Sequence, residues 1–376
     1  MATIGYLTTI QFDFGAIGTL AAECERLGIV KPLVVTDAGV RAAGLLTRLP
    51  LPDTTPVFDR TTSNPRESSV LDAVGVYRQH GCDGVIGMGG GSSLDLAKAV
   101  ALAATHPGAL KQYALIEGGL SRITAAVAPV IAIPTTAGTG SEVGRAAVII
   151  LEDGRKVGLI SPYMIPKLAI CDPELTYGLP PHLTAATGMD AITHCFETFM
   201  APAFNPPADG IALDGLRCGW RAIETAFSNP LDALARRDMM SASMQGALAF
   251  QKGLGAVHSL SHAIGGLRPE LHHGELNAAL LPHVIRFNAK ADTVVAEGKI
   301  ERLAETIGVE PTVAALAAAV TSLIARLGLK TRLREFGLSR MEFESIISRA
   351  TKDHCHATNP RIATVADYDR LLNAAL

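Results

Sequence analysis

The sequence predicts an α/β N-terminal nucleotide-binding domain, built on a parallel, Rossmann-like sheet, followed by an all-α C-terminal metal-binding domain. Short apolar strands alternate with helical segments through the first half of the chain, a pattern typical of parallel sheets covered by helices. A glycine-rich turn follows one of these strands. Strand signals vanish near position 180, and histidines gather beyond it. We therefore expect two domains, residues 1–180 and 181–376.

Four short apolar runs are predicted to be buried strands because each has four or five residues and they alternate with helical patterns. They are Pro32–Thr36, Gly84–Met88, Val130–Pro134 and Leu168–Cys171. The helical patterns between them are Gly15–Leu27, Glu67–His80 and Leu94–Ala104. A β-hairpin is expected where residues 145–151 and 155–160 flank a tight turn at Glu152-Asp153-Gly154.

Beyond the prolines at 180 and 181, helices rich in alanine and leucine are expected to the end of the chain. Segments with asparagine, glycine and proline at 205–207, 229–230 and 308–311 are predicted to separate them. The sequence shows no internal repeat. We expect residues 181–376 to form one helical domain.

Length and composition limit the classes of function. The 376 residues suffice for two domains, each with its own core. A formal net charge of −3 gives no reason to expect nucleic acid or an anionic membrane as a partner. No apolar run could span a bilayer, and the N-terminal segment lacks the pattern of a signal peptide. Six scattered cysteines without CxxC spacing are typical of reduced thiols, so we expect a cytoplasmic protein.

A glycine-rich turn follows the second predicted strand. Its glycines, Gly89, Gly90 and Gly91, allow a ligand to approach the backbone closely. Either Ser92 or Ser93 can cap the following helix. The first turn of a helix favours an anion. The segment is neither a P-loop nor a GxGxxG fingerprint. We expect a cradle for the diphosphate of a dinucleotide; the alternative is a turn with a structural role only.

Two further stretches lie at the carboxyl ends of predicted strands, where α/β sheets bind ligands. Residues Pro134–Glu142 (PTTAGTGSE) are rich in glycine and hydroxyl groups and can wrap a nucleotide. Asp37 follows the first predicted strand. Its carboxylate can accept both ribose hydroxyls of an adenosine and would repel a 2′-phosphate. Its alternative role is to cap the next helix.

The second half of the chain holds two pairs of metal-ligating residues with helical spacing. Asp190 and His194 are four residues apart, as are His258 and His262, and the doublet His272-His273 follows. Four residues advance a helix by about 400°, so the members of a pair point the same way. Both pairs have apolar neighbours, so these polar groups need partners. If the two helices face each other, one carboxylate and two or three imidazoles meet, as in a mononuclear metal site.

Five motifs together resemble the iron-containing, group III alcohol dehydrogenases. They are GGGSSLDLAK, PTTAGTGSE, GMDAITHCFE, HSLSHAIGG and HHG, in the order and close to the spacing of that family. The sequence TNPR at Thr358–Arg361 also fits. The resemblance spans essentially the whole chain. It implies an N-terminal dinucleotide-binding domain and a C-terminal helical metal domain.

By position, the resemblance implies four metal ligands, Asp190, His194, His258 and His273. It places His262 near the nicotinamide, as the catalytic residue that orients the substrate or passes a proton outward. The cofactor-binding residues, from the resemblance and the glycine-rich turn, are Asp37, Asn64, Gly90, Gly91, Ser92, Asp95, Thr135, Thr136 and Lys156. The family uses NAD(H) with Fe(II) or sometimes Zn(II), and its members are usually dimers, so we expect a homodimer.

The doubled histidine departs from the family pattern. There, a ligand histidine followed by glycine stands ten residues after the position of His262; that spacing reaches His272, whereas the His-Gly match reaches His273. Adjacent side chains diverge by about 100° on a helix and about 180° on a strand, so one of the two must face elsewhere. We predict that His273 is the ligand, because Gly274 lets the backbone turn sharply into the next helix.

The resemblance implies a metal-dependent, NAD(H)-linked alcohol dehydrogenase or aldehyde reductase. Hydride would move between a small alcohol and nicotinamide while the metal polarises the substrate oxygen. A reductase resembling maleylacetate reductase is one alternative, although it generally lacks this metal set. A lyase resembling 3-dehydroquinate synthase needs several basic residues, and the motifs have mainly Lys252 and Arg268 nearby. A regulatory metal-binding protein would need no nucleotide cradle.

Overall fold

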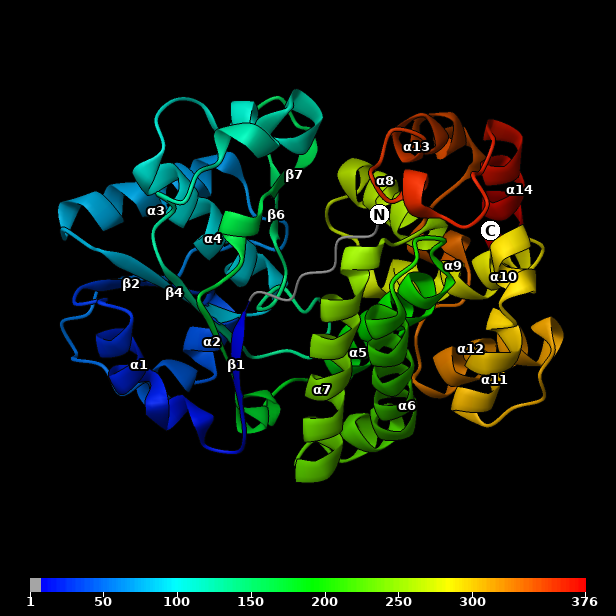
Figure 1. Ribbon diagram of the computed structural model, residues 1–376, viewed down its shortest axis with the longest axis horizontal. Helices are drawn as coiled ribbons and strands as arrows, with labels where there is room; N and C mark the ends of the chain where they lie inside the picture. The colour runs from blue at the N-terminus through cyan, green and yellow to red at the C-terminus, as the bar shows by residue number, and fades with distance from the viewer. Residues whose placement is uncertain (1–7) are drawn as a thin grey trace. The chain divides into compact units, whose positions relative to one another are not determined.

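The computed structural model describes residues 8–376. Their contacts divide the chain into two compact units (Figure 1). Residues 8–136 and 140–178 form the first, called the α/β unit below. Residues 137–139 and 179–376 form the second, called the helical unit. The predicted fold class, a parallel α/β sheet followed by an all-helical region, is confirmed.

The α/β unit is built on a six-stranded sheet in the order β1-β8-β5-β4-β2-β3, with every neighbouring pair parallel. The strands are β1 (Thr9–Phe12), β2 (Pro32–Val35), β3 (Val57–Phe58), β4 (Gly84–Gly89), β5 (Val130–Pro134) and β8 (Leu168–Cys171). The four predicted strands are therefore confirmed as β2, β4, β5 and β8. Because β5, β4 and β2 are neighbours, the three segments that follow them leave the sheet at adjacent positions.

Helices cover both faces of this sheet, which explains why its inner strands β8, β5, β4 and β2 lack polar side chains. Successive side chains of a strand point to opposite faces. On one face, Leu33 and Val85 belong to a buried cluster with α3 (Glu67–Gln79) and α4 (Gly91–Thr105). On the other, Val34 and Ile86 belong to a cluster that includes α1 (Leu20–Arg26) and α2 (Ala38–Ala42).

Two features of the α/β unit differ from the prediction. Helix α4 begins at Gly91, its N-cap is Gly90, and no side chain caps it, so the prediction of a serine cap is wrong. The sequence also gave no indication of β1 and β3. Both are edge strands; β1 alternates polar and apolar residues, and β3 has only two residues.

The predicted hairpin is confirmed as a separate two-stranded sheet. Strand β6 (Ala146–Ile150) pairs antiparallel with β7 (Lys156–Ile160), and Ile149 faces Val157 in the register. Gly154 adopts a φ of 81°, which suits a glycine in the tight turn between them.

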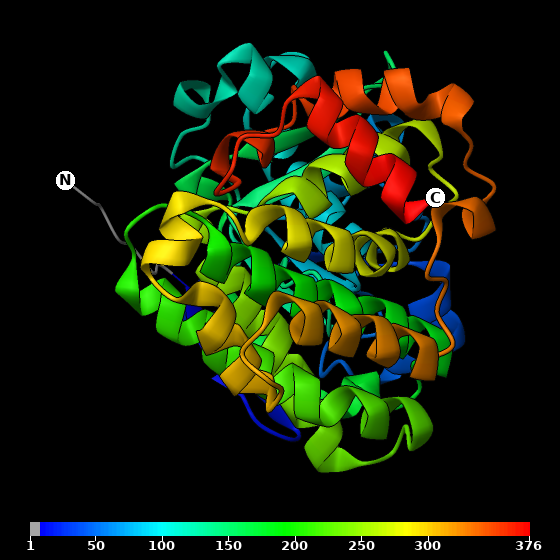
Figure 2. The same cartoon turned by 90° about the vertical axis from the view of Figure 1, so that its right-hand side faces the viewer.

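The helical unit contains helices α5 to α14 (Figure 2). They span α5 (Pro181–Met200), α6 (Pro206–Ser228), α7 (Ala233–Ala249), α8 (Ala256–Leu267), α9 (His273–Asn288), α10 (Asp292–Ala296), α11 (Lys299–Ile307), α12 (Val313–Arg326), α13 (Phe343–Ala350) and α14 (Val365–Ala375). Helix α5 packs against α6, α7 and α9, while α9 also packs against α8 and α12. Every residue of α5 from Gly188 to Met200 is buried, so α5 forms the centre of this unit.

The predicted breaks between helices are confirmed, and side-chain caps mark three helix starts. The side chains of Asn205, Asp232 and Thr312 accept hydrogen bonds from backbone N–H groups in the first turns of α6, α7 and α12. Within residues 8–376, none of the helices combines the length and the apolar character needed to cross a membrane.

Candidate functional site

The centre of α5 presents a row of buried polar side chains on one helix face. Asp190, His194 and Glu197 stand at positions i, i+4 and i+7, the spacing that keeps side chains on one side of a helix. All three are at most 5% exposed. Polar groups so deeply buried require partners, and α8 and α9 supply them.

Helices α8 and α9 bring the histidines of the second motif to this face. His258 lies in the first turn of α8 and is 1% exposed. His273 is the first residue of α9, and His272 is its N-cap. A Cβ atom at Gly274 would lie only 2.0 Å from the carbonyl oxygen of Ala186, so the glycine permits α9 to start in close contact with α5.

Three of the four predicted ligands surround one carboxylate oxygen of the fourth, and atoms of Asp190, His194 and His258 lie within 4.8 Å of one another. The Oδ1 atom of Asp190 lies 3.8 Å from His194 Nε2, 3.6 Å from His258 Nε2 and 3.7 Å from His273 Nε2. Two ligands of one tetrahedral ion with bonds near 2.1 Å are about 3.4 Å apart, so these separations are close to those of a first coordination shell. One carboxylate and three imidazoles are a donor set that suits Fe(II) and Zn(II).

Glu197 fixes the orientation and tautomer of His258. Its Oε2 lies 2.6 Å from His258 Nδ1, and its carboxylate also accepts hydrogen bonds from the backbone N–H groups of Val257 and His258. Because Glu197 holds the Nδ1 proton, Nε2, which faces Asp190, is the nitrogen that would bind a metal once its own proton has left. Carboxylate–histidine pairs of this kind orient metal ligands and raise their basicity.

The ionisation of this centre follows from burial and mutual charge. Burial lowers the pKa of His194 to about 4, so its ring is neutral near pH 7. Burial also opposes charge on His258, but hydrogen bonds to Asp190 and Glu197 raise its pKa to about 9. Burial would raise the pKa of Asp190; the neighbouring imidazoles instead hold it well below its usual range. The carboxylate is therefore ionised, as a metal ligand must be.

Asn277 joins the same ligands from the next turn of α9. Its Nδ2 lies 2.7 Å from Asp190 Oδ1, 3.0 Å from His273 Nε2 and 3.3 Å from His258 Nε2. Its Oδ1 is buried and has no hydrogen-bond partner among residues 8–376. The amide nitrogen thus contacts three of the four predicted ligands.

His262 lies one turn after His258 on α8, between Asp353 and His273. Its Nδ1 lies 3.0 Å from Asp353 Oδ2. Its ring is stacked on that of His273, with centroids 5.3 Å apart and an interplanar angle of 12°. The predicted catalytic histidine therefore lies next to the predicted metal ligand His273.

In the α/β unit, the predicted cofactor residues follow the carboxyl ends of β2, β4 and β5. They include Asp37, Gly90, Gly91, Thr135 and Thr136. The backbone N–H of Thr135 donates to the carbonyl of Gly89, 3.0 Å away, and ties two of these segments together. Adjacent carboxyl ends of parallel strands are where α/β sheets bind nucleotides.

Asp37 holds the glycine-rich turn against the first βα connection. Its Oδ1 accepts a hydrogen bond from Val40 N, which caps α2, and its Oδ2 accepts one from Ser93 Oγ at 2.8 Å. Gly89 has a φ of 148°, and a Cβ atom there would lie 2.6 Å from Ser93 Oγ. Glycine is therefore required at position 89 for this turn to form.

Three more predicted cofactor residues lie together. Asn64, which has a φ of 66°, donates its backbone N–H to Ser92 Oγ at 3.3 Å and accepts a hydrogen bond from Lys156 Nζ at 2.8 Å. Asp95 has different surroundings: it accepts hydrogen bonds from Ser141 Oγ and from Val148 N. Asp95 thus binds to the segment that follows β5.

Comparison with known proteins assigns the family. The model of the iron-containing alcohol dehydrogenase domain matches residues 8–173, and the model of the C-terminal domain of the Fe-containing alcohol dehydrogenase family matches residues 184–376. The chain belongs to the iron-containing alcohol dehydrogenase family. It is therefore an oxidoreductase that acts on CH–OH groups, and the reading as a lyase or a regulatory protein is not supported.

Relatives and solved structures of this family agree over the whole chain. A 4-hydroxybutyrate dehydrogenase of Cupriavidus necator is 57% identical, with all of both chains covered. A 1,3-propanediol dehydrogenase of Klebsiella pneumoniae is 36% identical over 93% of this chain and 92% of its own. A crystal structure of 1,3-propanediol oxidoreductase superposes with a TM-score of 0.93 at 34% identity, with both chains fully covered. A maleylacetate reductase from Agrobacterium tumefaciens, 28% identical, gives a lower TM-score of 0.79 with 100% and 99% coverage.

Three residues of this site were not predicted from the sequence. Glu197 and Asn277 each had a signal, because they follow Asp190 by seven residues and His273 by four, spacings that place them on the same helix face. Asp353 had none: it is separated from His262 by 91 residues, and no local pattern connects the two.

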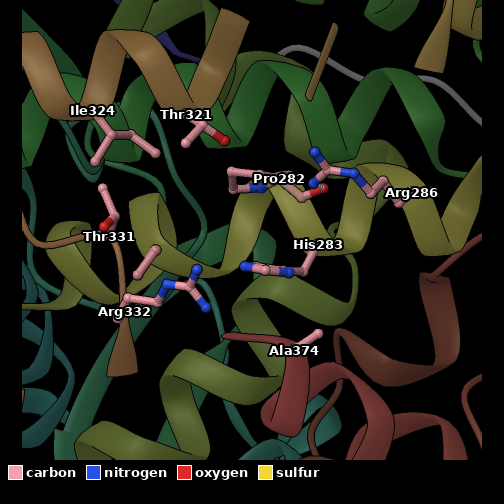
Figure 3. Close-up of a pocket in the computed structure, with 9 residues that line it drawn as sticks. Pro282, His283, Arg286, Thr321, Ile324, Thr331, Arg332 and Ala374 are labelled. Atoms are coloured by element: carbon pink, nitrogen blue, oxygen red, sulfur yellow. Dashed lines mark hydrogen bonds between the residues drawn. The ribbon is translucent and has the colours of Figure 1, made fainter. Parts of the chain in front are cut away.

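A cavity of about 420 Å³ elsewhere in the helical unit contains none of these residues (Figure 3). Its walls come from α9, α12, α14 and the segment after α12. Figure 3 shows the guanidinium of Arg332 pointing toward the ring of His283. Burial and the charges of Arg286 and Arg332 lower the pKa of His283 to about 4.

Proposed function

We propose that this enzyme oxidises 4-hydroxybutyrate with NAD⁺ and reduces the corresponding semialdehyde with NADH. One observation carries the choice of substrate: the relative named for this activity is 57% identical over the full length of both chains. The relatives named for 1,3-propanediol or methanol are 35–36% identical. We also propose that the chain acts as a cytoplasmic homodimer, in keeping with the family resemblance.

In this proposal, residues 1–180 bind the dinucleotide and residues 181–376 bind the metal and the substrate. Asp190, His194, His258 and His273 would hold one divalent metal, Fe(II) in the native enzyme. When bound, the metal supplies Lewis-acid polarisation of the substrate oxygen. Glu197 supports this role because it orients His258, and Asn277 supports it because its amide contacts Asp190.

His262 handles the proton that leaves the alcohol. With its Nδ1 proton directed at Asp353, its Nε2 carries the lone pair and can accept the hydroxyl proton. A bound NAD⁺ would supply the acceptor for the carbinol hydride, C4 of its nicotinamide, which would take both electrons of the C–H bond. The substrate would thus lose one hydride and one proton, giving the aldehyde and NADH.

A comparison of substrates tests the proposed function. We expect kcat/KM for 4-hydroxybutyrate with NAD⁺ to exceed that for 1-butanol, in which a methyl group replaces the carboxylate, by at least about tenfold, since a recognised charged group contributes about 1.4 kcal/mol or more. Initial rates of NADH formation on iron-loaded protein give the ratio. Equal rates for both alcohols, or a preference for 1,3-propanediol, would contradict this assignment.

For the cofactor, we propose contacts from Asp37, Asn64, Gly90, Gly91, Ser92, Thr135, Thr136 and Lys156, with Asp95 in a supporting place. Asp37→Gly is expected to raise the kcat/KM ratio of NADPH to NADH, because the wild-type carboxylate would repel a 2′-phosphate. Loss of the α2 cap should cost only a few tenths of a kcal/mol of unfolding free energy, because glycine is itself tolerated at an N-cap. The kcat/KM ratio comes from initial rates with each cofactor, and the stability from thermal melts.

A matched control separates the two roles of Asp37. Asp232→Gly removes the cap of α7 in the helical unit, so it should lower stability to a similar degree while leaving the cofactor preference unchanged. If the wild-type enzyme uses NADPH at least as well as NADH, Asp37 serves only as a helix cap.

A further inference from the structure

Next to the proposed metal centre, the helical unit holds a second cluster of metal-ligating side chains. It consists of His262 on α8 and of Asp353, His354 and Cys355 in the turn after α13. One donor atom from each residue lies within 4.8 Å of the other three. We propose that this cluster is a second cation site, selective for a thiophilic divalent ion such as Zn²⁺, and that its occupation inhibits the enzyme. The inhibitory role rests on the proposed function of His262.

The backbone between α13 and the 3₁₀ turn His356–Thr358 makes the convergence of three consecutive residues possible. In a helix or strand, adjacent side chains diverge. Here the backbone N–H of Cys355 donates to Asp353 Oδ1 at 2.8 Å, and this tight turn folds the segment back on itself. As a result, His354 Nε2 lies 3.4 Å from Cys355 Sγ, and Asp353 Oδ2 reaches His262 Nδ1 at 3.0 Å.

The ligand atoms of this cluster include a sulfur, that of Cys355, which the proposed metal centre lacks. Two imidazoles, one carboxylate and one thiol form a complete tetrahedral set for zinc, and the thiol favours Zn²⁺ over Fe²⁺ or Mg²⁺. Of the described ligands in the first centre, none is a sulfur. The side chain of His354 is 45% exposed and offers the ion a path from solvent, whereas Cys355 is 1% exposed.

Binding of the cation requires one proton to leave. Burial and the charge of Asp353 raise the pKa of the Cys355 thiol well above its usual range, so the free site holds a neutral thiol. The ion replaces this proton as the thiolate forms a bond to it, and no electron transfer is involved. Zinc binding should therefore release about one proton per site to the buffer.

Inhibition follows from the tautomer of His262. In the free enzyme, Nδ1–H points at Asp353 and Nε2 carries the lone pair. A cation bound at Nδ1 uses that nitrogen's lone pair, so in the neutral ring the proton resides on Nε2. The nitrogen proposed above to take the alcohol proton then carries a hydrogen itself and cannot accept another.

The test uses iron-loaded enzyme with Cys355→Ser, and Cys218→Ser as the matched control. Cys218 is a partly exposed thiol on α6, beside Asp214 and outside the cluster. We expect Zn²⁺ and Cd²⁺ to inhibit the wild type and Cys218→Ser equally. Cys355→Ser should require at least about tenfold more ion for half inhibition while its activity without added ion stays within about twofold. His354→Ala should behave like Cys355→Ser.

A second readout does not depend on turnover. Cd²⁺ bound to a thiolate gives an ultraviolet charge-transfer band; we expect one such ion per chain in the wild type and none in Cys355→Ser. Iron content, measured on the same samples, should stay constant through the titration. The inference would be overturned by equal inhibition of Cys355→Ser and the wild type, by absence of the band in the wild type, or by loss of iron in step with inhibition. If 4-hydroxybutyrate proves not to be the substrate, the band still reports on this site and inhibition is measured with the alcohol that is oxidised.

Discussion

Glu197→Ala is expected to weaken binding of the divalent metal by about 10- to 100-fold, the usual consequence of removing the carboxylate that orients a histidine ligand. The structure gives two physical reasons. Glu197 holds the proton on His258 Nδ1, so its loss allows the tautomer whose Nε2 carries hydrogen and cannot bind metal. It also leaves the backbone N–H groups of Val257 and His258 without their buried acceptor, which costs about 1–3 kcal/mol each.

Elemental analysis after dialysis against a graded series of chelator concentrations measures this effect. Activity should fall in parallel and recover in part when Fe(II) is added in excess, because the ligands themselves are retained. Glu197→Gln keeps the size of the side chain and should be intermediate. Glu224→Ala serves as a control: this glutamate on α6 is half-exposed and pairs with Arg326, so its removal should leave metal affinity unchanged. Wild-type metal affinity in Glu197→Ala would show that His258 is oriented without this carboxylate.

The parts of the fold that could be predicted are those whose residue pattern is compatible with a single kind of secondary structure. Four-residue runs such as Leu168–Cys171 are apolar on both faces, and only a strand covered by helices on both sides buries them fully. Strand β1 (Thr9–Phe12) could not be predicted this way because it lies at a sheet edge and includes polar side chains. The helix cap was misassigned because Ser93 has another partner, the carboxylate of Asp37.

Site residues that lie on one helix could be predicted from their spacing in the sequence. Asp190 and His194 are one turn apart on α5, so their common direction follows from the sequence. Their partners in space come from α8 and α9, and only tertiary packing brings those helices to α5. The pairing of His262 with Asp353 also depends on tertiary packing, since nothing near Asp353 in the sequence indicates a histidine partner.

The two adjacent histidines are expected to differ in their effect on metal binding. His273→Ala should lose most of its metal and activity, while His272→Ala should keep its metal. His273 is the first residue of α9, and its Nε2 lies 3.7 Å from Asp190 Oδ1 and 3.0 Å from Asn277 Nδ2. His272 precedes it with extended backbone, at φ −74° and ψ 124°, so its side chain leaves the chain in a different direction.

The surroundings of His272 agree with a position next to the proposed metal centre but not among its ligands. Its Nδ1 is buried without a hydrogen-bond partner among residues 8–376, and burial lowers the pKa of its ring. A neutral imidazole with a free polar atom can line the substrate pocket, so His272→Ala should change KM more than metal content. Both variants are to be analysed for metal after equal exposure to Fe(II), followed by kcat and KM measurements on the loaded forms. Metal loss in His272→Ala together with retention in His273→Ala would assign the fourth ligand to His272 and place the extra residue of this loop after the ligand.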